Sequence, residues 1–542
     1  MKTFDMFFSL IRVAIGRQTK LPCVPSDNEW MHILSLLQKH ALQGIGFVAM
    51  QKLPREQWPP SDVVRSLIGY SIKIKEKNAL LNDECVAVVK QLEHDGLDAV
   101  VIKGQSNLEC YPEDLREYRC AGDIDVWTTL INDEGLKNND SVRTRDKDCC
   151  PQADSFGEQQ LSSIGQQLSK KYSCSNREGE IPIAVQMGDS VEYEYYKGVR
   201  GIIEYARLQR RLRDDKSHFK PLYSHVEFHT DKGTEVEMHY RPSFLCSPIR
   251  NMRMQRWFKE QFDVCLKNYC QLGFPVLTSS VNVVYQLVHL YRHVFEGGIG
   301  LRQLMDYYFV LRVWHNDVME CKDLQSQGMW GEGLGTPVMS KEEVMAVLRS
   351  FGMGKFAGAV MWVLNEVFGG VNENDNENDK CSRRTRRGSN ENDNANENNP
   401  QRTRRDTDGG PQADSFGGRQ LDNNKYPQMS QIDTDGCPQA ECFDERELSQ
   451  INRELKENNF VPWMICEPNE NEGRKLLAEI LQEGNFRQYD TRDAELKRGG
   501  MVKHGVWKLK RMMRLVRSYP EEALWEPVFR VWHLGWSMLK GY

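Results

Sequence analysis

Long apolar runs and paired cysteines are both missing from this sequence. No stretch of about 18 apolar residues occurs in the 542-residue chain, which excludes a membrane-spanning helix from the elements that we expect. The 15 cysteines are scattered, odd in number and never spaced as CxxC, so we expect free thiols in a reducing cytoplasm and no disulfide framework. Asp5 and Arg12 interrupt the first apolar run, which favours an amphipathic helix over a signal peptide.

A large excess of charge of either sign is missing as well. The formal net charge is −6, so nothing marks the chain as a whole as a binder of nucleic acid. Hydrophobic residues make up 39% of the sequence, which is enough for a packed core. A single core usually stops growing at roughly 250–300 residues, so a chain of this length predicts more than one domain.

Two polar segments interrupt the chain. The first, at about 132–180, lacks periodic apolar positions, and the second, at 371–448, contains NENDNENDK and NENDNANENN beside arginine clusters. Segments of this composition cannot bury enough apolar surface to offset the entropy lost on ordering. We therefore predict two disordered insertions.

Outside these segments, periodicity predicts helices, then a few strands, then helices almost to the end. Residues 26–29 form a capping box before a helix, and Gly96 is placed to end a later helix. Short strands are predicted over 99–102 and 122–127, and a hairpin over 226–240. The predicted fold class is α+β, with a small mixed sheet, a large helical C-terminal part and two disordered insertions.

This pattern divides the chain into five parts. They are an N-terminal helical region at 1–95, an α+β core at 96–245 with the polar insertion at about 132–180, a helical domain at 246–370, the low-complexity insertion at 371–448, and a C-terminal helical region at 449–542. Every candidate site residue lies in the second or the third part.

The second predicted strand carries two aspartates. Residues two apart in a strand project from the same face, so Asp123 and Asp125 present two carboxylates side by side, while Ile124 and Val126 face apolar packing. Aligned carboxylates repel each other, and a bound cation compensates for that repulsion. Oxygen ligands suit Mg²⁺, which keeps waters and substrate phosphates as its other ligands. A DxD pattern also occurs in solvated loops, so the motif alone is a hypothesis.

The turn after the first predicted strand is a candidate phosphate site. Lys103, Gly104 and Ser106 stand where that strand runs into an expected helix. Helix N-termini offer free N–H groups and the positive end of a dipole. Gly104 lets a phosphate approach the backbone, Ser106 adds a hydroxyl donor and Lys103 supplies charge. An ordinary strand-to-helix turn would look the same in sequence.

Several stretches of the sequence are together similar to one enzyme family. The run VVIKGQSNLECYP, followed by LREYRCAGDIDVW, resembles an uncharacterised bacterial nucleotidyltransferase family of the DNA polymerase beta-like superfamily. VEMHYRPSFL from Val236, GIGLRQLMDYY from Gly298, and the later GNFRQYDTRD and SYPEEALWEPVFR agree with it. The superfamily pairs a Gly-Ser turn with a D-x-D strand and a third acid on a later strand. Here Gln105 separates the glycine from the serine.

The resemblance implies an enzyme that moves a nucleoside monophosphate from an NTP, such as ATP, to an unknown acceptor, with two Mg²⁺ ions as cofactors. It implies catalytic and metal-binding roles for Asp123, Asp125 and Glu237, the last because it lies in the matching strand. The expected nucleotide- or phosphate-binding residues are Lys103, Gly104, Ser106, Arg119 and Arg302, supported by His239 and Asp306. The acceptor stays open among a small molecule, a glycan precursor and a protein, and nucleic acid is not expected.

The predicted hairpin offers rival acids and an apparent metal site. Each of its strands carries three polar residues on one face: His225, Glu227 and His229 on the first, and Glu235, Glu237 and His239 on the second. If residues 231–233 form a three-residue loop with a left-handed Gly233, Glu227 lies opposite Glu237, whereas an even loop separates the two sets. The Asp-Lys-Gly sequence favours the three-residue loop. A zinc site of histidines is then geometrically possible, but we expect His239 to orient Glu237 or to contact substrate.

Three helical features invite more than one interpretation. His289 and His293 lie four apart but lack the glutamate of HExxH, so we expect a packed or phosphate-facing pair. Arg302 and Asp306 would also suit an exposed i,i+4 ion pair. The last predicted helix carries an aromatic stripe of Trp525, Phe529, Trp532 and Trp536. A basic stretch precedes it, which would suit an anionic membrane or a nucleic acid, but we expect the stripe to face the core.

Two other classes of function stay open. A non-catalytic nucleotide-binding or antitoxin-like interaction protein would keep the same fold, although the presence of Asp123, Asp125 and Glu237 argues against it. The arginine clusters beginning at Arg383 and Arg402 would suit a nucleic-acid-binding module. Because those clusters lie in the asparagine-rich insertion, that function ranks last.

Overall fold

The computed structural model describes residues 2–130, 180–187, 190–216, 219–326, 338–369, 463–487 and 501–540. Within these ranges helices predominate around a small mixed sheet, which confirms the predicted α+β class. The insertions predicted at about 132–180 and 371–448 lie outside the described residues, apart from Glu180. The domain boundaries stay a prediction.

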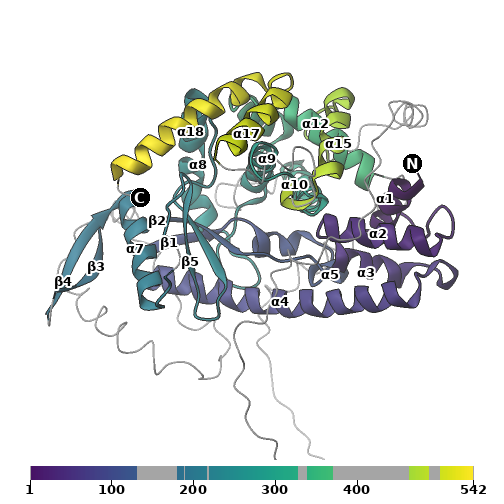
Figure 1. Ribbon diagram of the computed structural model, residues 1–542, viewed down its shortest axis with the longest axis horizontal. Helices are drawn as coiled ribbons and strands as arrows, with labels where there is room; N and C mark the ends of the chain where they lie inside the picture. Colours follow the sequence, from purple (N-terminus) through teal and green to yellow (C-terminus); the bar gives the residue numbers. More distant parts are fainter. Residues whose placement is uncertain are drawn as a thin grey trace, which may run out of the picture. The chain divides into compact units, whose positions relative to one another are not determined.

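A four-stranded mixed sheet carries the segment with the two aspartates (Figure 1). Its strands, in spatial order, are β1 (Leu97–Val101), β2 (Ile124–Leu130), β6 (Glu235–His239) and β5 (His225–His229). β2 is antiparallel to β1 and parallel to β6, and β5 is antiparallel to β6. The parallel pair joins two strands that are far apart in the sequence, so no short turn sets its register.

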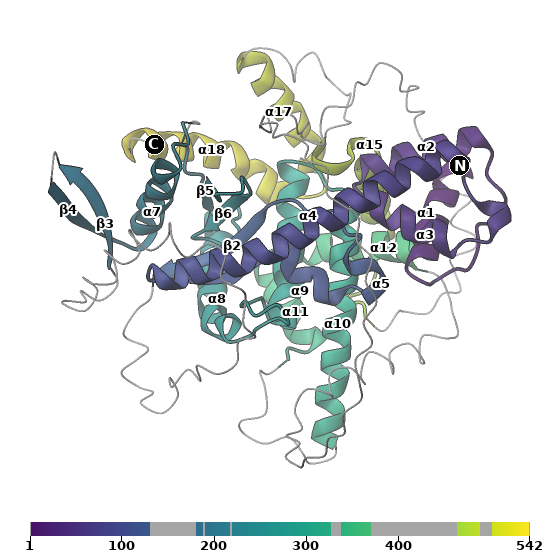
Figure 2. The ribbon, with the colours of Figure 1, turned by 90° about the horizontal axis from the view of Figure 1, so that it is seen from below.

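Alternation along these strands gives the sheet one apolar face. That face comprises Ile124, Val126, Val226, Phe228, Val236 and Met238. It packs against α4 (Ser61–His94) and α7 (Gly198–Leu212), with Leu81 and Val88 from the first helix and Ile202 and Ile203 from the second (Figure 2). Each such buried side chain contributes about 1.5–3 kcal/mol. The residues that alternate with the apolar ones project from the opposite face.

The N-terminal region forms helices with the predicted caps. α1 (Lys2–Ala14), α2 (Asp27–Lys39) and α3 (Gln43–Lys52) precede α4. Ser26 caps α2 in a capping box, in which the Ser26 N–H donates to Glu29 Oε2 at 2.7 Å. Gly96 follows the end of α4 with a φ of 87°, a left-handed conformation that glycine adopts without steric cost. Both sequence signals are confirmed.

The C-terminal part is helical, as predicted. Its helices are α8 (Pro248–Leu266), α9 (Ser279–Phe295), α10 (Leu301–Ser326), α11 (Lys341–Ser350), α12 (Gly354–Phe368), α15 (Glu470–Glu483), α17 (Met501–Val516) and α18 (Pro520–Lys540). The shorter helices among the described residues are η1 (Arg55–Gln57), η2 (Gly104–Cys110), α5 (Glu113–Arg116) and η4 (Asn485–Arg487). The larger hydrophobic core contains Phe7, Trp30, Tyr285, Trp314 and Phe356, so it joins helices from widely separated parts of the chain.

Three consecutive elements were not expected from the sequence. β3 (Glu180–Met187) pairs antiparallel with β4 (Ser190–Lys197), and α7 follows directly (Figure 1). In α7, Ile202, Ile203 and Ala206 are buried among charged neighbours. This short apolar stripe has the spacing of a helix that covers a sheet.

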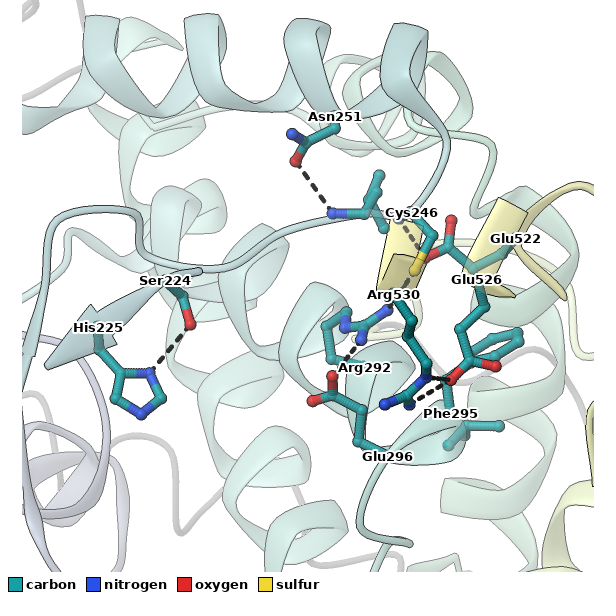
Figure 3. Close-up of polar contacts among 12 residues, drawn as sticks. Ser224, His225, Cys246, Asn251, Arg292, Phe295, Glu296, Glu522, Glu526 and Arg530 are labelled. Atoms are coloured by element: carbon teal, nitrogen blue, oxygen red, sulfur yellow. Dashed lines mark hydrogen bonds and ion pairs between the residues drawn. The ribbon is translucent and has the colours of Figure 1, made fainter. Parts of the chain in front are cut away.

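A buried ion pair connects α9 to α18 (Figure 3). Arg292 of α9 lies 3.1 Å from Glu522 Oε1 of α18 and pairs with Glu296 one turn further along its own helix. Glu522 also accepts a hydrogen bond from the Cys246 N–H at 2.6 Å. Because the Glu522 side chain is only 1% exposed, its charge depends on these partners. The segment after β6 is therefore anchored to two helices.

α18 buries its aromatic stripe only in part. Phe529 packs against Tyr223, with ring centroids 5.0 Å apart. Trp525 and Trp532, however, are 40% and 51% exposed. The prediction of a core-facing stripe is wrong for these two tryptophans, because α18 contacts the protein along the line of Glu522 and Phe529 and the tryptophans lie beside it. None of the described helices is both long and apolar enough to cross a membrane.

Candidate functional site

The strand register brings carboxylates from three strands together. Asp125 on β2 is paired with Glu237 on β6, which is paired in turn with Glu227 on β5. All three project from the face opposite the apolar one, and Asp123 stands immediately before β2. One oxygen from each of Asp123, Asp125 and Glu237 lies within 4.8 Å of the others. The three predicted catalytic carboxylates are thus neighbours in the structure.

The hairpin between β5 and β6 turns through three residues, as the Asp-Lys-Gly sequence predicts. The Thr230 N–H donates to Thr234 O at 2.8 Å, and the Gly233 N–H donates to Thr230 O at 2.9 Å. Gly233 has a φ of 80°, which the turn requires and which glycine tolerates. His225 is consequently paired with His239, and the polar residues of both strands share one face.

Two nitrogen-bearing side chains lie among the carboxylates. Lys103 forms an ion pair with Asp125, and its Nζ lies 3.5 Å from Glu237 Oε2. His239 Nε2 lies 3.0 Å from both Asp125 Oδ1 and Glu237 Oε2. The Lys103 and His239 side chains are 17% and 5% exposed, so solvent screens these attractions only weakly. Lys103 and His239 each contact a carboxylate on β2 and one on β6, and so offset the repulsion between those two carboxylates.

The same contacts shift the proton affinities of the cluster. The Asp125 carboxylate, together with burial, raises the pKa of Asp123 from 3.8 to about 6. Burial alone would raise the pKa of Glu237, but Lys103 and the hydrogen bond to His239 hold it well below its ordinary value. Burial opposes protonation of His239, yet its hydrogen bonds to Asp125 and Glu237 raise its pKa. Negative charge held in this way attracts further cations.

The predicted phosphate turn packs against Asp123. Lys103 is extended, Gly104 has a φ of 60°, and a Cβ at Gly104 would lie 3.4 Å from Asp123 O. Ser106 is buried, and its hydroxyl donates to Lys103 O at 3.3 Å. The expected helix is η2, which is of the 3-10 type and only 7 residues long. Such a short helix offers a weaker dipole, so a phosphate here would depend mainly on Lys103 and the close approach at Gly104.

Arg119 and Asp306 form a buried bidentate ion pair. Arg119 Nε and Nη2 lie 2.6 and 2.7 Å from Asp306 Oδ1 and Oδ2, and the Tyr111 hydroxyl donates to Asp306 Oδ1 at 2.5 Å. Asp306 therefore pairs with Arg119, and the exposed i,i+4 pair with Arg302 does not form. Arg302 Nη1 donates to Cys120 O at 2.8 Å, and its Nε has no hydrogen-bond partner among the described residues.

Asp306→Asn is expected to lower the free energy of unfolding by about 3–5 kcal/mol, because it leaves the buried Arg119 charge uncompensated. Asp62→Asn is the matched control. Asp62 pairs with Arg65, but their side chains are 80% and 71% exposed, and such a pair contributes at most about 1 kcal/mol. Denaturant unfolding of the full chain measures both, and equal losses in the two variants would contradict the assignment.

The sequence did not indicate a tyrosine that lies close to these charges. Tyr285 of α9 is fully buried, its hydroxyl has no hydrogen-bond partner among the described residues, and burial and the nearby carboxylates raise its pKa. Its ring stacks on His289, whose Nε2 lies 3.0 Å from His293 Nε2. Burial lowers the pKa of both imidazoles, that of His293 to about 4, which favours their neutral form. No motif marks Tyr285, because α9 is apolar on most sides.

The donor atoms of the site fit divalent cations. Asp123, Asp125 and Glu237 offer three carboxylate oxygens at close range, which is the ligand type that Mg²⁺ prefers. His225, Glu237 and His239 form a second group whose ligand atoms also lie within 4.8 Å of one another. Glu237 belongs to both groups.

One comparison with known protein families finds a match. The model of a family described as uncharacterised nucleotidyltransferase matches residues 26–134 and 192–328. These two ranges include the three carboxylates, the turn at Gly104, both arginines and the β5–β6 hairpin. The match confirms the family resemblance seen in the sequence. No curated protein and no solved structure matches the chain.

Proposed function

We propose that this chain, which matches the uncharacterised nucleotidyltransferase family, is a magnesium-dependent enzyme that moves a nucleoside monophosphate from an NTP to an acceptor. The observation that carries the proposal is the close approach of Asp123, Asp125 and Glu237 on one face of the sheet. Two magnesium ions, when bound, would neutralise the triphosphate and activate the attacking group of the acceptor. Pyrophosphate is the leaving group.

Each of the three carboxylates has a proposed role as a ligand of these ions. Asp123 and Asp125 are the proposed ligands of both ions, and Glu237 is the proposed ligand on the side of the attacking group. Backbone hydrogen bonds between β2 and β6 hold Asp125 and Glu237 in register. The carboxylates are therefore preorganised, and little reorganisation is needed when the substrate binds.

The phosphate contacts come from the turn and from the helical domain. Lys103, Gly104 and Ser106 are the proposed contacts of the triphosphate, since the turn lies against Asp123. Arg302 is a better candidate than Arg119 for a direct contact, because Asp306 already engages two nitrogens of Arg119. Arg119 then supports the segment that leads into β2. The acceptor is proposed to be a small molecule, a glycan precursor or a protein.

Labelled NTPs test the proposal. Full-length protein incubated with each α-labelled NTP, Mg²⁺ and a cell lysate is expected to label a discrete acceptor and to release pyrophosphate. EDTA should abolish the labelling, because the carboxylates cannot hold the triphosphate without cations. Tight NTP binding with no transfer to any lysate component would instead support the non-catalytic nucleotide-binding protein.

A further inference from the structure

We propose that His225, Glu237 and His239 bind a divalent transition ion of the zinc class, beside the magnesium ligands Asp123 and Asp125. This inference deepens the proposed function and rests on it for the catalytic role of the ion. In the proposed function this ion would take the place of the magnesium ion on the side of Glu237, so that the centre holds one magnesium ion and one ion bound partly by nitrogen.

The geometry brings the three ligand groups to one point. His239 Nε2 lies 3.0 Å from Glu237 Oε2, and His225 Nε2 lies 3.8 Å from Glu237 Oε1. The two imidazoles therefore approach different oxygens of one carboxylate, and their ring centroids are 4.7 Å apart. The three-residue turn creates this arrangement, since it pairs His225 with His239 across the hairpin.

The orientation of His225 suits a ligand. Its Nδ1 lies 3.0 Å from the Ser224 hydroxyl oxygen, a contact that Figure 3 shows, and its Nε2 is turned toward Glu237. Histidines that bind metals usually use their second ring nitrogen for a hydrogen bond of this kind, which fixes the ring. The His225 side chain is 14% exposed, so a small ion can reach it from solvent.

The donor chemistry selects the class of ion. Imidazole nitrogen suits zinc and similar borderline ions, whereas magnesium strongly prefers oxygen. Three protein ligands with an open position are the pattern of catalytic zinc. Glu227, whose Oε1 lies 3.4 Å from His225 Nε2, adds negative charge, while the Lys103 ammonium, 3.5 Å from Glu237 Oε2, opposes it. In the alternative, both imidazoles only donate hydrogen bonds to carboxylates. The affinity for a metal ion would then not depend on either imidazole.

Cobalt is the probe, because Co²⁺ takes zinc sites and absorbs visible light according to its ligands. Full-length protein freed of metal with a chelator is titrated with Co²⁺ alone. The wild type is expected to develop a visible absorption band, and His225→Asn to raise the dissociation constant at least about tenfold and to change the band. Ser224→Ala should weaken binding by about tenfold, since it only frees the ring.

His229→Asn is the matched control. His229 lies on the same strand and face, but it contacts Asp215 at 3.6 Å and belongs to neither ligand group. Circular dichroism checks that each variant is folded. Unchanged Co²⁺ affinity in His225→Asn, or an equal loss in His229→Asn, would overturn the proposal. If Co²⁺ binding depends on His225 while labelled NTPs give no transfer, the metal site stands and the proposed enzyme function fails.

Discussion

Asp123→Asn is expected to lower nucleotidyl transfer by at least about a thousandfold while the protein stays folded. Asp123 is the proposed ligand of both metal ions, and an amide oxygen is a far weaker ligand than a carboxylate. The fold should tolerate the change, because the Asp125 carboxylate already repels Asp123 and raises its pKa to about 6. Unfolding free energy should be unchanged or higher.

The measurement is transfer from a labelled NTP in Mg²⁺, with thermal unfolding followed in parallel. Asp83→Asn, at an exposed position of α4, is the matched control and should keep full activity. Asp125→Asn is a less clean test, because Asp125 also holds Lys103 and His239. Full transfer by Asp123→Asn, or transfer that EDTA does not affect, would exclude the metal mechanism.

Glu237→Gln is expected to reduce turnover by about two to three orders of magnitude while the NTP dissociation constant stays within a few-fold. Glu237 is the proposed ligand on the side of the attacking group, so its loss harms the chemical step. Binding of the triphosphate depends instead on Asp123, Asp125 and the turn at Gly104. A parallel rise of KM without a fall in kcat would show that Glu237 serves substrate binding.

Two neighbouring glutamates are the controls for Glu237. Glu235 is paired with His229 at the far end of β6, so Glu235→Gln should be nearly fully active. Glu227 lies directly opposite Glu237 in the hairpin, so Glu227→Gln should show only a modest loss. An inactive Glu227→Gln beside an active Glu237→Gln would assign the third carboxylate to β5 instead of β6. Single-turnover and steady-state kinetics on the same preparations separate these cases.

The sequence alone was sufficient for features that depend on near neighbours. The capping box at Ser26, the end of α4 at Gly96 and the three-residue turn at Gly233 were all predicted and are present. The period of two along β2 also predicted that Asp123 and Asp125 share a face. Each of these features follows from the backbone preferences of a few consecutive residues, which are the same in any fold.

Local backbone preferences are not sufficient to predict the conformation of the helix after Gly104. A helix was expected there without its type, and the segment is a short 3-10 helix that side chains of other helices hold in place. The Gln105 amide donates to Asn82 Oδ1 of α4 at 2.6 Å, and the Asn282 amide of α9 donates to Asn107 Oδ1 at 3.0 Å. Contacts with two distant helices set the path of this turn.

Tertiary structure alone decided the partners of residues that are far apart in the sequence. The parallel pairing of β2 with β6 places Glu237 beside Asp125, and the family resemblance, not any local signal, had suggested that acid. Tertiary packing also decided that Asp306 pairs with Arg119 between buried segments, and that Trp525 remains 40% exposed on α18. Such partners depend on how the whole core packs, because the energy of burying apolar surface and of compensating buried charge is gained only when distant segments meet.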